Sequence, residues 1–383
     1  MPTPPAPSHL AALAAAERYR QALVHGGAEA AAAATAALRD QPDALKLPPD
    51  GAPDEAAITR AGDGAVHRSG ISLPFGVQLR MTHVPLGMVD LFEEGERPLI
   101  TVTATAGQYV RAHVTAVVEG FSTSAIGTLT TDGKQPATLD LLPTFAPAHA
   151  ARLTRPVRAA VRVTIRELDG GRVPLERTYR LWLLPPTTAV TFEQDPSTGR
   201  WSSLAEYLAG WVTPDDPAIM GVLRKAAELT PGRGLVGYQT GDDGVREGVR
   251  AIYGALQQHG LVYLNSVAAH GAANAFVQRV RLPAESLRDR GANCLDGAVL
   301  YASLFEAASL EAGVVLMPSH AYVAWRARSG GPWEFLETIM TGTHDFEAAH
   351  AQATRLHAAI AGQADVRVLD IAALRKQGYL AMG

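Results

Sequence analysis

The spacing of apolar residues changes along this chain, and that change limits the folds available to it. Between residues 71 and 190, short runs rich in Val, Ile, Thr and Tyr alternate apolar and polar positions and are separated by turn residues. The runs 161–168 and 175–183 are joined through Asp-Gly-Gly-Arg at 169–172, which is typical of a β-hairpin. We therefore expect residues 71–190 to form an antiparallel β-sandwich.

Beyond residue 190 the spacing becomes that of α-helices. Four apolar residues on one helix face follow a possible cap at Asp242 and end before Gly260. A second helical pattern follows Cys294 and gives way to three short strand-like runs, so this part is expected to be α+β. The four apolar residues are Val245, Val249, Ile252 and Leu256, and the three runs are 314–317, 321–325 and 333–338.

The first 70 residues have a third composition. Alanine dominates residues 28–38, and Pro, Gly and Asp are concentrated in 41–63. We expect two helices and a linker here, including an amphipathic helix over 10–23 that is marginal in isolation. The sequence thus predicts an α+β protein in three parts: a helical segment at 1–70, an immunoglobulin-like antiparallel β-sandwich at 71–190 and an α+β domain at 191–383.

Charge and hydropathy exclude several classes of partner. The chain carries 38 acidic and 34 basic side chains, and four of the basic residues are lysines, which leaves 30 arginines scattered without a run. We therefore predict no nucleic-acid partner. No segment approaches the roughly 18 apolar residues that span a bilayer, and the N-terminus lacks the basic region of a signal peptide. We expect no membrane partner and a cytoplasmic location.

Cysteine and histidine spacing argue against a bound metal or cofactor. The single cysteine, Cys294, excludes a disulfide within the chain and suits a reducing compartment. His344, His350 and His357 lack the paired spacing of metal ligands. The run 232–237 spells G-x-G-x-x-G but follows a helical pattern rather than a strand, as a dinucleotide site requires. The sequence predicts no cofactor and no metal.

Cys294 lies where a loop becomes a helix. Unpaired N–H groups and the helix dipole stabilise anions at such a position, and a thiolate is an anion. The alternative is that a lone cysteine serves as a small buried apolar residue. Asp296, two residues later, projects to another side of the helix, so we expect it to stabilise the helix N-terminus rather than to act with Cys294.

His320 follows Cys294 by 26 residues, at the start of an expected strand. If the turn at 326–331 closes a hairpin, paired residue numbers sum to about 657 with a register uncertain by about two residues, which puts Glu337 beside His320. A carboxylate there would hold the imidazole through its second nitrogen. The alternatives are a surface or core histidine and a solvated charge at a strand end.

Three short runs around these residues occur in a characteristic order. Asn-Cys-Leu-Asp at 293–296 starts a helix, Ser-His-Ala at 319–321 starts a strand, and Phe-Leu-Glu-Thr at 335–338 lies on the strand after it. In order and spacing they resemble the transglutaminase-like superfamily of papain-fold cysteine enzymes, of which many bacterial members are peptidases. The resemblance implies a papain-like α+β fold for the C-terminal domain.

The resemblance also implies a role for each residue. Cys294 would be the nucleophile, His320 the general base and acid, and Glu337 the residue that orients the imidazole. Two positions depart from the family, which more often has Asp in place of Glu337 and Gly in place of Ser319. Beside the backbone N–H of Cys294, Gln278 is our candidate donor for an oxyanion hole, although its position equally suits an exposed polar residue on a strand.

The expected function is therefore acyl transfer through a Cys294 thioester, most simply hydrolysis of a peptide or isopeptide bond in a protein or peptide substrate. An amine acceptor in place of water would give transglutaminase or acyltransferase chemistry. The non-enzymatic alternative is a scaffold that has lost productive geometry and binds a protein through the β-sandwich. The sequence leaves the substrate and the oligomeric state open.

Overall fold

The computed structural model describes residues 21–22, 33, 75–92, 96–107, 109–169, 174–194, 201–232, 234–235, 237–265, 275–317, 320–363 and 366–382. Its architecture is mixed α+β. Apart from the helical Gln21, Ala22 and Ala33, the segment expected at residues 1–70 lies outside the described residues. Contacts divide the rest into two compact units. The strand-rich unit comprises described residues within 75–203 and 275–278, and the helix-rich unit those within 204–265 and 279–382.

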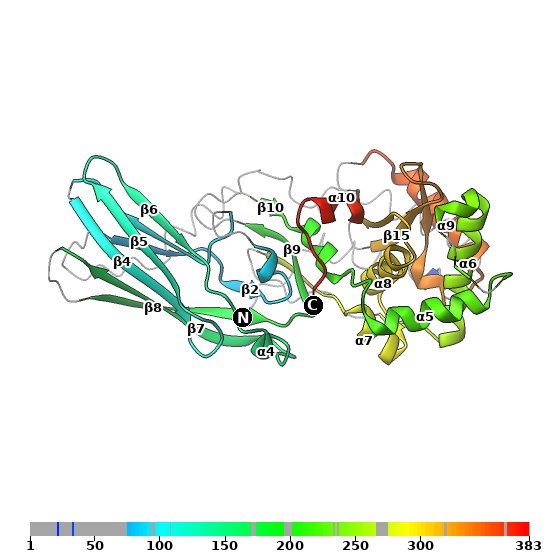
Figure 1. Ribbon diagram of the computed structural model, residues 1–383, viewed down its shortest axis with the longest axis horizontal. Helices are drawn as coiled ribbons and strands as arrows, with labels where there is room; N and C mark the ends of the chain where they lie inside the picture. The colour runs from blue at the N-terminus through cyan, green and yellow to red at the C-terminus, as the bar shows by residue number, and fades with distance from the viewer. Residues whose placement is uncertain are drawn as a thin grey trace. The chain divides into compact units, whose positions relative to one another are not determined.

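The strand-rich unit contains two main sheets (Figure 1). One has the order β1-β3-β6, formed by β1 (Phe75–Leu79), β3 (Ile100–Ala104) and β6 (Ala137–Leu141). The other has the order β2-β8-β7-β4-β5, formed by β2 (His83–Pro85), β8 (Leu175–Leu184), β7 (Val157–Glu167), β4 (Tyr109–Val118) and β5 (Ala125–Asp132). Neighbouring strands are antiparallel except β2 and β8, which are parallel. Short helical turns η2 (Val89–Leu91) and α4 (Pro147–Ala150) also belong to this unit.

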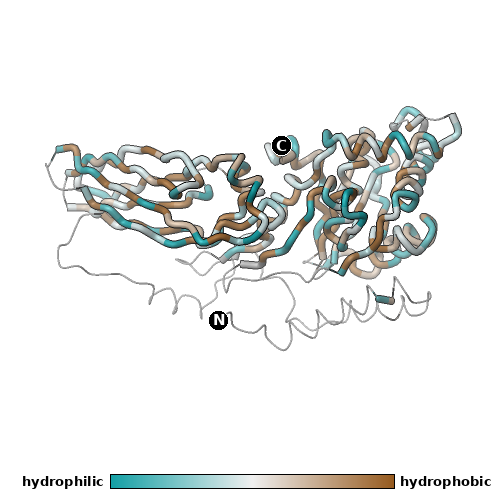
Figure 2. The backbone as a smooth tube through the Cα atoms, turned by 90° about the horizontal axis from the view of Figure 1, so that it is seen from below, coloured by the Kyte–Doolittle hydropathy of each residue, from teal (hydrophilic) through white to brown (hydrophobic). Residues whose placement is uncertain are grey.

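Alternation of apolar and polar residues explains these strands, as the tube in Figure 2 illustrates. On β7, Val161, Val163 and Ile165 are buried, whereas the arginines between and beside them are exposed, because successive side chains of a strand point to opposite faces. The hairpin predicted from the sequence is confirmed: β7 pairs with β8 in a register that sets Val161 opposite Tyr179. Its tip, at 170–173, lies outside the described residues.

A third sheet has the order β10-β9-β12. Its strands are β9 (Thr188–Gln194), β10 (Trp201–Ser203) and β12 (Ala275–Arg279). Strand β9 crosses the boundary expected between residues 190 and 191, and helical structure starts only at η3 (Ala205–Trp211). The sequence pattern missed β12 as a partner of β9 because strand pairing over such a distance leaves no local signal.

The helix-rich unit surrounds the helix that starts at Cys294, α8 (Cys294–Ala307), which packs on strands β14 and β15 (Figure 1). The sheet has the order β16-β15-β14-β17, and a small parallel pair joins β11 to β13. Its strands are β14 (Ala312–Met317), β15 (His320–Arg326), β16 (Trp333–Leu336), β17 (Arg367–Asp370), β11 (Val262–Tyr263) and β13 (Gly291–Ala292). The other helices are α5 (Pro217–Glu228), η4 (Tyr238–Thr240), α6 (Gly241–His259), α7 (Pro283–Asp289), η5 (Thr338–Met340), α9 (Phe346–Ile360) and α10 (Ile371–Lys376).

Two helices of this unit follow directly from the sequence. The four apolar residues predicted for one face of α6 are each at most 1 % exposed, which confirms the prediction. Asp242, expected as a cap, lies instead in the first turn, because the helix begins at Gly241. Helix α8 is buried from Cys294 to Phe305 on every side, so it is a core helix rather than an amphipathic one. Within the described part of the chain, no helix combines the length and apolarity needed to cross a membrane.

Candidate functional site

Cys294 is the first residue of α8 and is 8 % exposed. The preceding Asn293 is the N-cap: its side-chain Oδ1 accepts a hydrogen bond from the backbone N–H of Asp296 at 2.8 Å. In return the backbone N–H of Asn293 donates to Asp296 Oδ2 at 3.1 Å. This reciprocal capping box fixes the start of the helix, and with it the position of Cys294.

Asp296 has a second set of partners on the segment before α7. The backbone N–H and the Nη1 group of Arg281 donate to its two carboxylate oxygens at 2.8 and 2.7 Å. Asp296 is fully buried and the Arg281 side chain is 12 % exposed, so this is an ion pair largely removed from water. The prediction that Asp296 stabilises the helix N-terminus and does not join the triad agrees with these contacts.

His320 and Glu337 meet in the core of the same unit. Nε2 of His320 lies 2.9 Å from Oε2 of Glu337, and both side chains are completely buried. Strands β15 and β16 pair with residue numbers that sum to 659, two more than expected, since Val323 faces Leu336. Glu337 therefore follows the strand as the N-cap residue of η5, and its carboxylate reaches His320 from there.

The side chain of Cys294 interacts with the imidazole of His320 and raises its pKa. Nε2 of the ring faces Glu337, and Nδ1 is buried. Burial by itself lowers the pKa of His320, but the negative charge of Glu337 and the hydrogen bonds to Cys294 and Glu337 outweigh it and raise the pKa to about 9. The structure thus brings Cys294, His320 and Glu337 together, with the imidazole between the other two.

The segment that carries Glu337 is fixed to the face of α8 that begins at Cys294. A Cβ atom at Gly297, one turn along that helix, would lie 2.7 Å from Oγ1 of Thr338, so only glycine permits this approach. One further turn on, the hydroxyls of Tyr301 and Thr341 are 2.9 Å apart, and Thr341 donates to the backbone carbonyl of Thr338 at 2.7 Å. These contacts hold the carboxylate-bearing segment against the helix of the nucleophile.

The structure also places the oxyanion candidate Gln278 and two of the histidines whose spacing was considered for a metal. Gln278 is half-buried on β12, in the strand-rich unit, and its role as an oxyanion donor stays a prediction. Ser319 lies outside the described residues. His350 Nδ1 bonds to the carbonyl of Phe335 and His357 Nδ1 to the hydroxyl of Tyr322.

The sequence raised two other kinds of ligand site, a metal site and a dinucleotide site, and the described residues support neither. In the ranges that the structure describes, no three His, Cys, Asp or Glu side chains are grouped so as to hold a metal ion. The described glycines of the 232–237 run lie between α5 and η4, without the preceding strand that a dinucleotide site needs.

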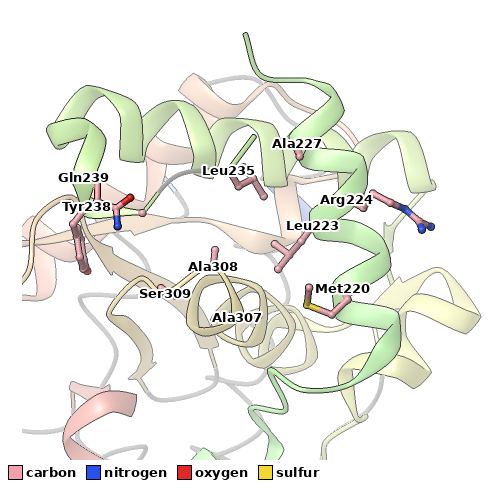
Figure 3. Close-up of a pocket in the computed structure, with 11 residues that line it drawn as sticks. Met220, Leu223, Arg224, Ala227, Leu235, Tyr238, Gln239, Ala307, Ala308 and Ser309 are labelled. Carbon is pink, nitrogen blue, oxygen red and sulfur yellow. The ribbon is translucent and has the colours of Figure 1, made fainter. Parts of the chain in front are cut away.

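A pocket of about 530 Å³ lies at the other end of α8, not at the thiol. Figure 3 shows it between α5, which contributes Leu223 and Arg224, and the residues that end α8, Ala307 to Ser309. Because α8 has 14 residues, its C-terminus is about 20 Å from Cys294. This pocket does not hold substrate next to the sulfur.

Sequence reasoning missed several residues that build the site. The capping role of Asn293 had a readable signal, an Asn followed three residues later by an acid before an apolar run. The ion pair of Arg281 and the contact between Gly297 and Thr338 had none, because both depend on segments that meet only in the folded chain. No protein-family model and no curated protein matches the chain.

Proposed function

We propose that this protein is a thiol acyl-transfer enzyme of the transglutaminase-like type, which hydrolyses peptide or isopeptide bonds through a Cys294 thioester. One observation carries the proposal: a single buried imidazole contacts both the only thiol of the chain and a buried carboxylate. A cysteine kept for packing alone needs neither partner. A papain-like helix-rich unit and an immunoglobulin-like strand-rich unit belong to the same proposal, as does a reducing, cytoplasmic location.

The arrangement suggests how the residues act. His320 takes the proton of Cys294, and the sulfur attacks the carbonyl carbon of the scissile bond. When the C–N bond breaks, the imidazolium returns that proton to the leaving amine, and a thioester remains on Cys294. His320 then takes a proton from water, which attacks the thioester and releases the carboxylic acid. Glu337 stabilises the imidazolium in both steps and holds the ring through Nε2.

The low exposure of Cys294 favours a second candidate function. With 8 % of its surface accessible, the residue suits a structural thiol in a non-catalytic scaffold that binds a protein through its strand-rich unit. The charged surroundings argue against this alternative, because a structural thiol gains nothing from an imidazole whose pKa is raised to about 9.

The rate of Cys294 alkylation by iodoacetamide against pH separates the two candidates. Since the chain has one cysteine, every adduct reports on this residue. A catalytic pair predicts a rate that rises at a pH well below the reference thiol pKa of about 8.5 and that shifts upward in His320→Ala and in the milder His320→Gln. A slow reaction that neither variant changes would support the scaffold.

Turnover is tested with an activated acyl ester and intact-mass detection. The proposal predicts an acyl adduct on the wild type that decays in water, and no adduct on Cys294→Ala. Added primary amines that intercept the adduct faster than water would assign the enzyme to acyl transfer rather than hydrolysis. Far-UV circular dichroism of each variant confirms that it is folded.

A further inference from the structure

A second concave surface of the helix-rich unit lies where α5, α6 and α7 meet. The cleft has a volume of about 630 Å³, within the range of roughly 300–1,000 Å³ typical of small-molecule sites. Its apolar floor includes Val222 of α5, Ala255 of α6 and Leu287 of α7. Neither Cys294 nor either of its two partners lines it, so the cleft is separate from the site described above.

Every charged residue that lines this cleft is basic. Lys225 lies on α5, Arg288 lies on α7, and Arg290 is the residue directly after α7. His259 of α6 adds an imidazole. Helix α5 and the C-terminal end of α7 thus contribute permanent positive charges to one hollow, and the imidazole of α6 lies 2.8 Å from the backbone carbonyl of Leu287 through Nε2. Convergence of cations from different elements on one concavity is the arrangement that recognises anions.

The ion pairs already present do not neutralise this cluster firmly. Lys225 contacts Glu228 at 3.0 Å and Arg288 contacts Asp289 at 2.9 Å, but all four side chains are at least 42 % exposed. Exposed pairs of this kind contribute little free energy, so both cations are available to a ligand. For Arg290 the described part of the chain shows no ion pair at all.

The backbone at Arg290 gives an independent indication. This residue ends α7 in the left-handed region, at φ 51°, where glycine is the usual choice because a side chain there is strained. The next residue, Gly291, has no such conformation. A strained arginine at the rim of a basic cleft is explained if its side chain has a task there, since strain of this kind concentrates at functional sites.

We infer that this cleft binds a small organic anion with about two negative charges next to an apolar group, such as a phosphate monoester. The basic residues would hold the charged end and the apolar floor would take the rest. Phosphate oxygens suit guanidinium groups because they accept paired hydrogen bonds. The inference stands whether or not Cys294 is catalytic.

Isothermal titration calorimetry at low ionic strength tests it with three probes: phenyl phosphate, inorganic phosphate and phenol. We expect phenyl phosphate to bind with a dissociation constant in the millimolar range or below, phosphate more weakly, and phenol not measurably. Absence of phenyl phosphate binding would overturn the inference. Equal affinities for phenyl phosphate and phosphate would overturn the assignment of the apolar floor.

Three variants locate the binding. Arg290→Gly and Lys225→Gln are each expected to weaken phenyl phosphate binding about tenfold. Arg224→Gln removes the neighbouring cation on the same helix, which lines the other pocket, and should leave the affinity unchanged. An equal loss in all three would show non-specific attraction and contradict the site.

Arg290→Gly also separates binding from folding. Glycine tolerates the left-handed conformation. The melting temperature of the variant should therefore equal or exceed that of the wild type, while its affinity for phenyl phosphate falls. Weaker binding together with a lower melting temperature would indicate a merely structural arginine and would overturn the role assigned to it.

Discussion

At the scale of single residues, the chemistry depends on the charge of one imidazole. Burial alone would keep His320 neutral, and a neutral imidazole cannot balance a thiolate. The carboxylate of Glu337, equally buried, is the largest of the causes that raise the pKa of His320 again, and Cys294 adds to it. The carboxylate therefore does more than orient the ring, because it also favours the charged form of the imidazole.

Glu337→Gln tests this dependence because it removes the charge and keeps the shape. Burial then dominates and the pKa of His320 should fall, so we expect alkylation of Cys294 at pH 7 to slow at least about tenfold. Glu334→Gln is the matched control, since Glu334 lies on β16, the strand directly before Glu337, and forms an ion pair with Arg246 rather than a contact with His320. Similar rates in both variants would refute the role of Glu337.

At the scale of elements, the start of α8 is determined by its cap. Asn293 and Asp296 exchange hydrogen bonds across the first turn, and Arg281 ties the same carboxylate to the preceding segment. The nucleophile thus lies on a helix start that is fixed from two directions. Helix ends normally fray, and this arrangement keeps the end that carries Cys294 in place.

Asp296→Ala leaves the guanidinium of Arg281 buried without its counter-charge. We expect a loss of about 3–5 kcal/mol in the free energy of unfolding, measured by urea denaturation. Asp345→Ala removes the exposed cap of α9 and should cost only about 1 kcal/mol. If the two losses were the same, the ion pair would contribute nothing beyond an ordinary cap.

Gly297→Ala tests the contact between α8 and η5. Alanine usually stabilises a helix by up to about 1 kcal/mol relative to glycine, but here its methyl group meets Thr338 at 2.7 Å. We expect a loss of about 1–3 kcal/mol and slower alkylation of Cys294, because displacement of Thr338 moves Glu337. Gly221→Ala on α5, where the added methyl group meets nothing within 4 Å, should instead stabilise the protein.

At the scale of the whole molecule, the buried charges link folding to pH. The pKa of His320 is raised from 6.5 to about 9 in the folded chain, so the protonated ring favours the folded state. That contribution is complete below pH 6.5 and disappears as the pH rises through 9. Folding thereby maintains the charged form of the site in the range where it is proposed to act.

The melting temperature of a Cys294→Ala protein is therefore expected to fall between pH 6.5 and 9.5 more steeply than that of Cys294→Ala/His320→Gln. Cys294 is replaced in both because its thiol titrates in the same range and is coupled to His320. Calorimetry in matched buffers measures the difference, and the other groups that titrate in this range cancel between the two proteins. Parallel curves would contradict a raised pKa of His320. A steeper fall in the variant would reverse the sign of the linkage.

The sequence by itself determined much of the local structure. Alternating residues predicted the hairpin of β7 and β8, and apolar spacing predicted α6 and α8, because both signals lie within a few residues of one another. Cys294 and Glu337 are 43 residues apart, so the expectation that they meet at His320 came from their order and spacing and not from a local pattern. Register was predicted only to two residues, since turn geometry and packing set it together.

Only the tertiary structure decided which distant groups meet. The arginines look scattered in the sequence, yet Arg158, Arg162 and Arg166 share the exposed face of β7, and the basic residues of the cleft come from three elements. The ion pair of Arg281 with Asp296 and the fit of Thr338 against Gly297 likewise join separate segments. Apolar periodicity records which face of an element is buried, but the partners on that face are chosen by packing of the whole chain.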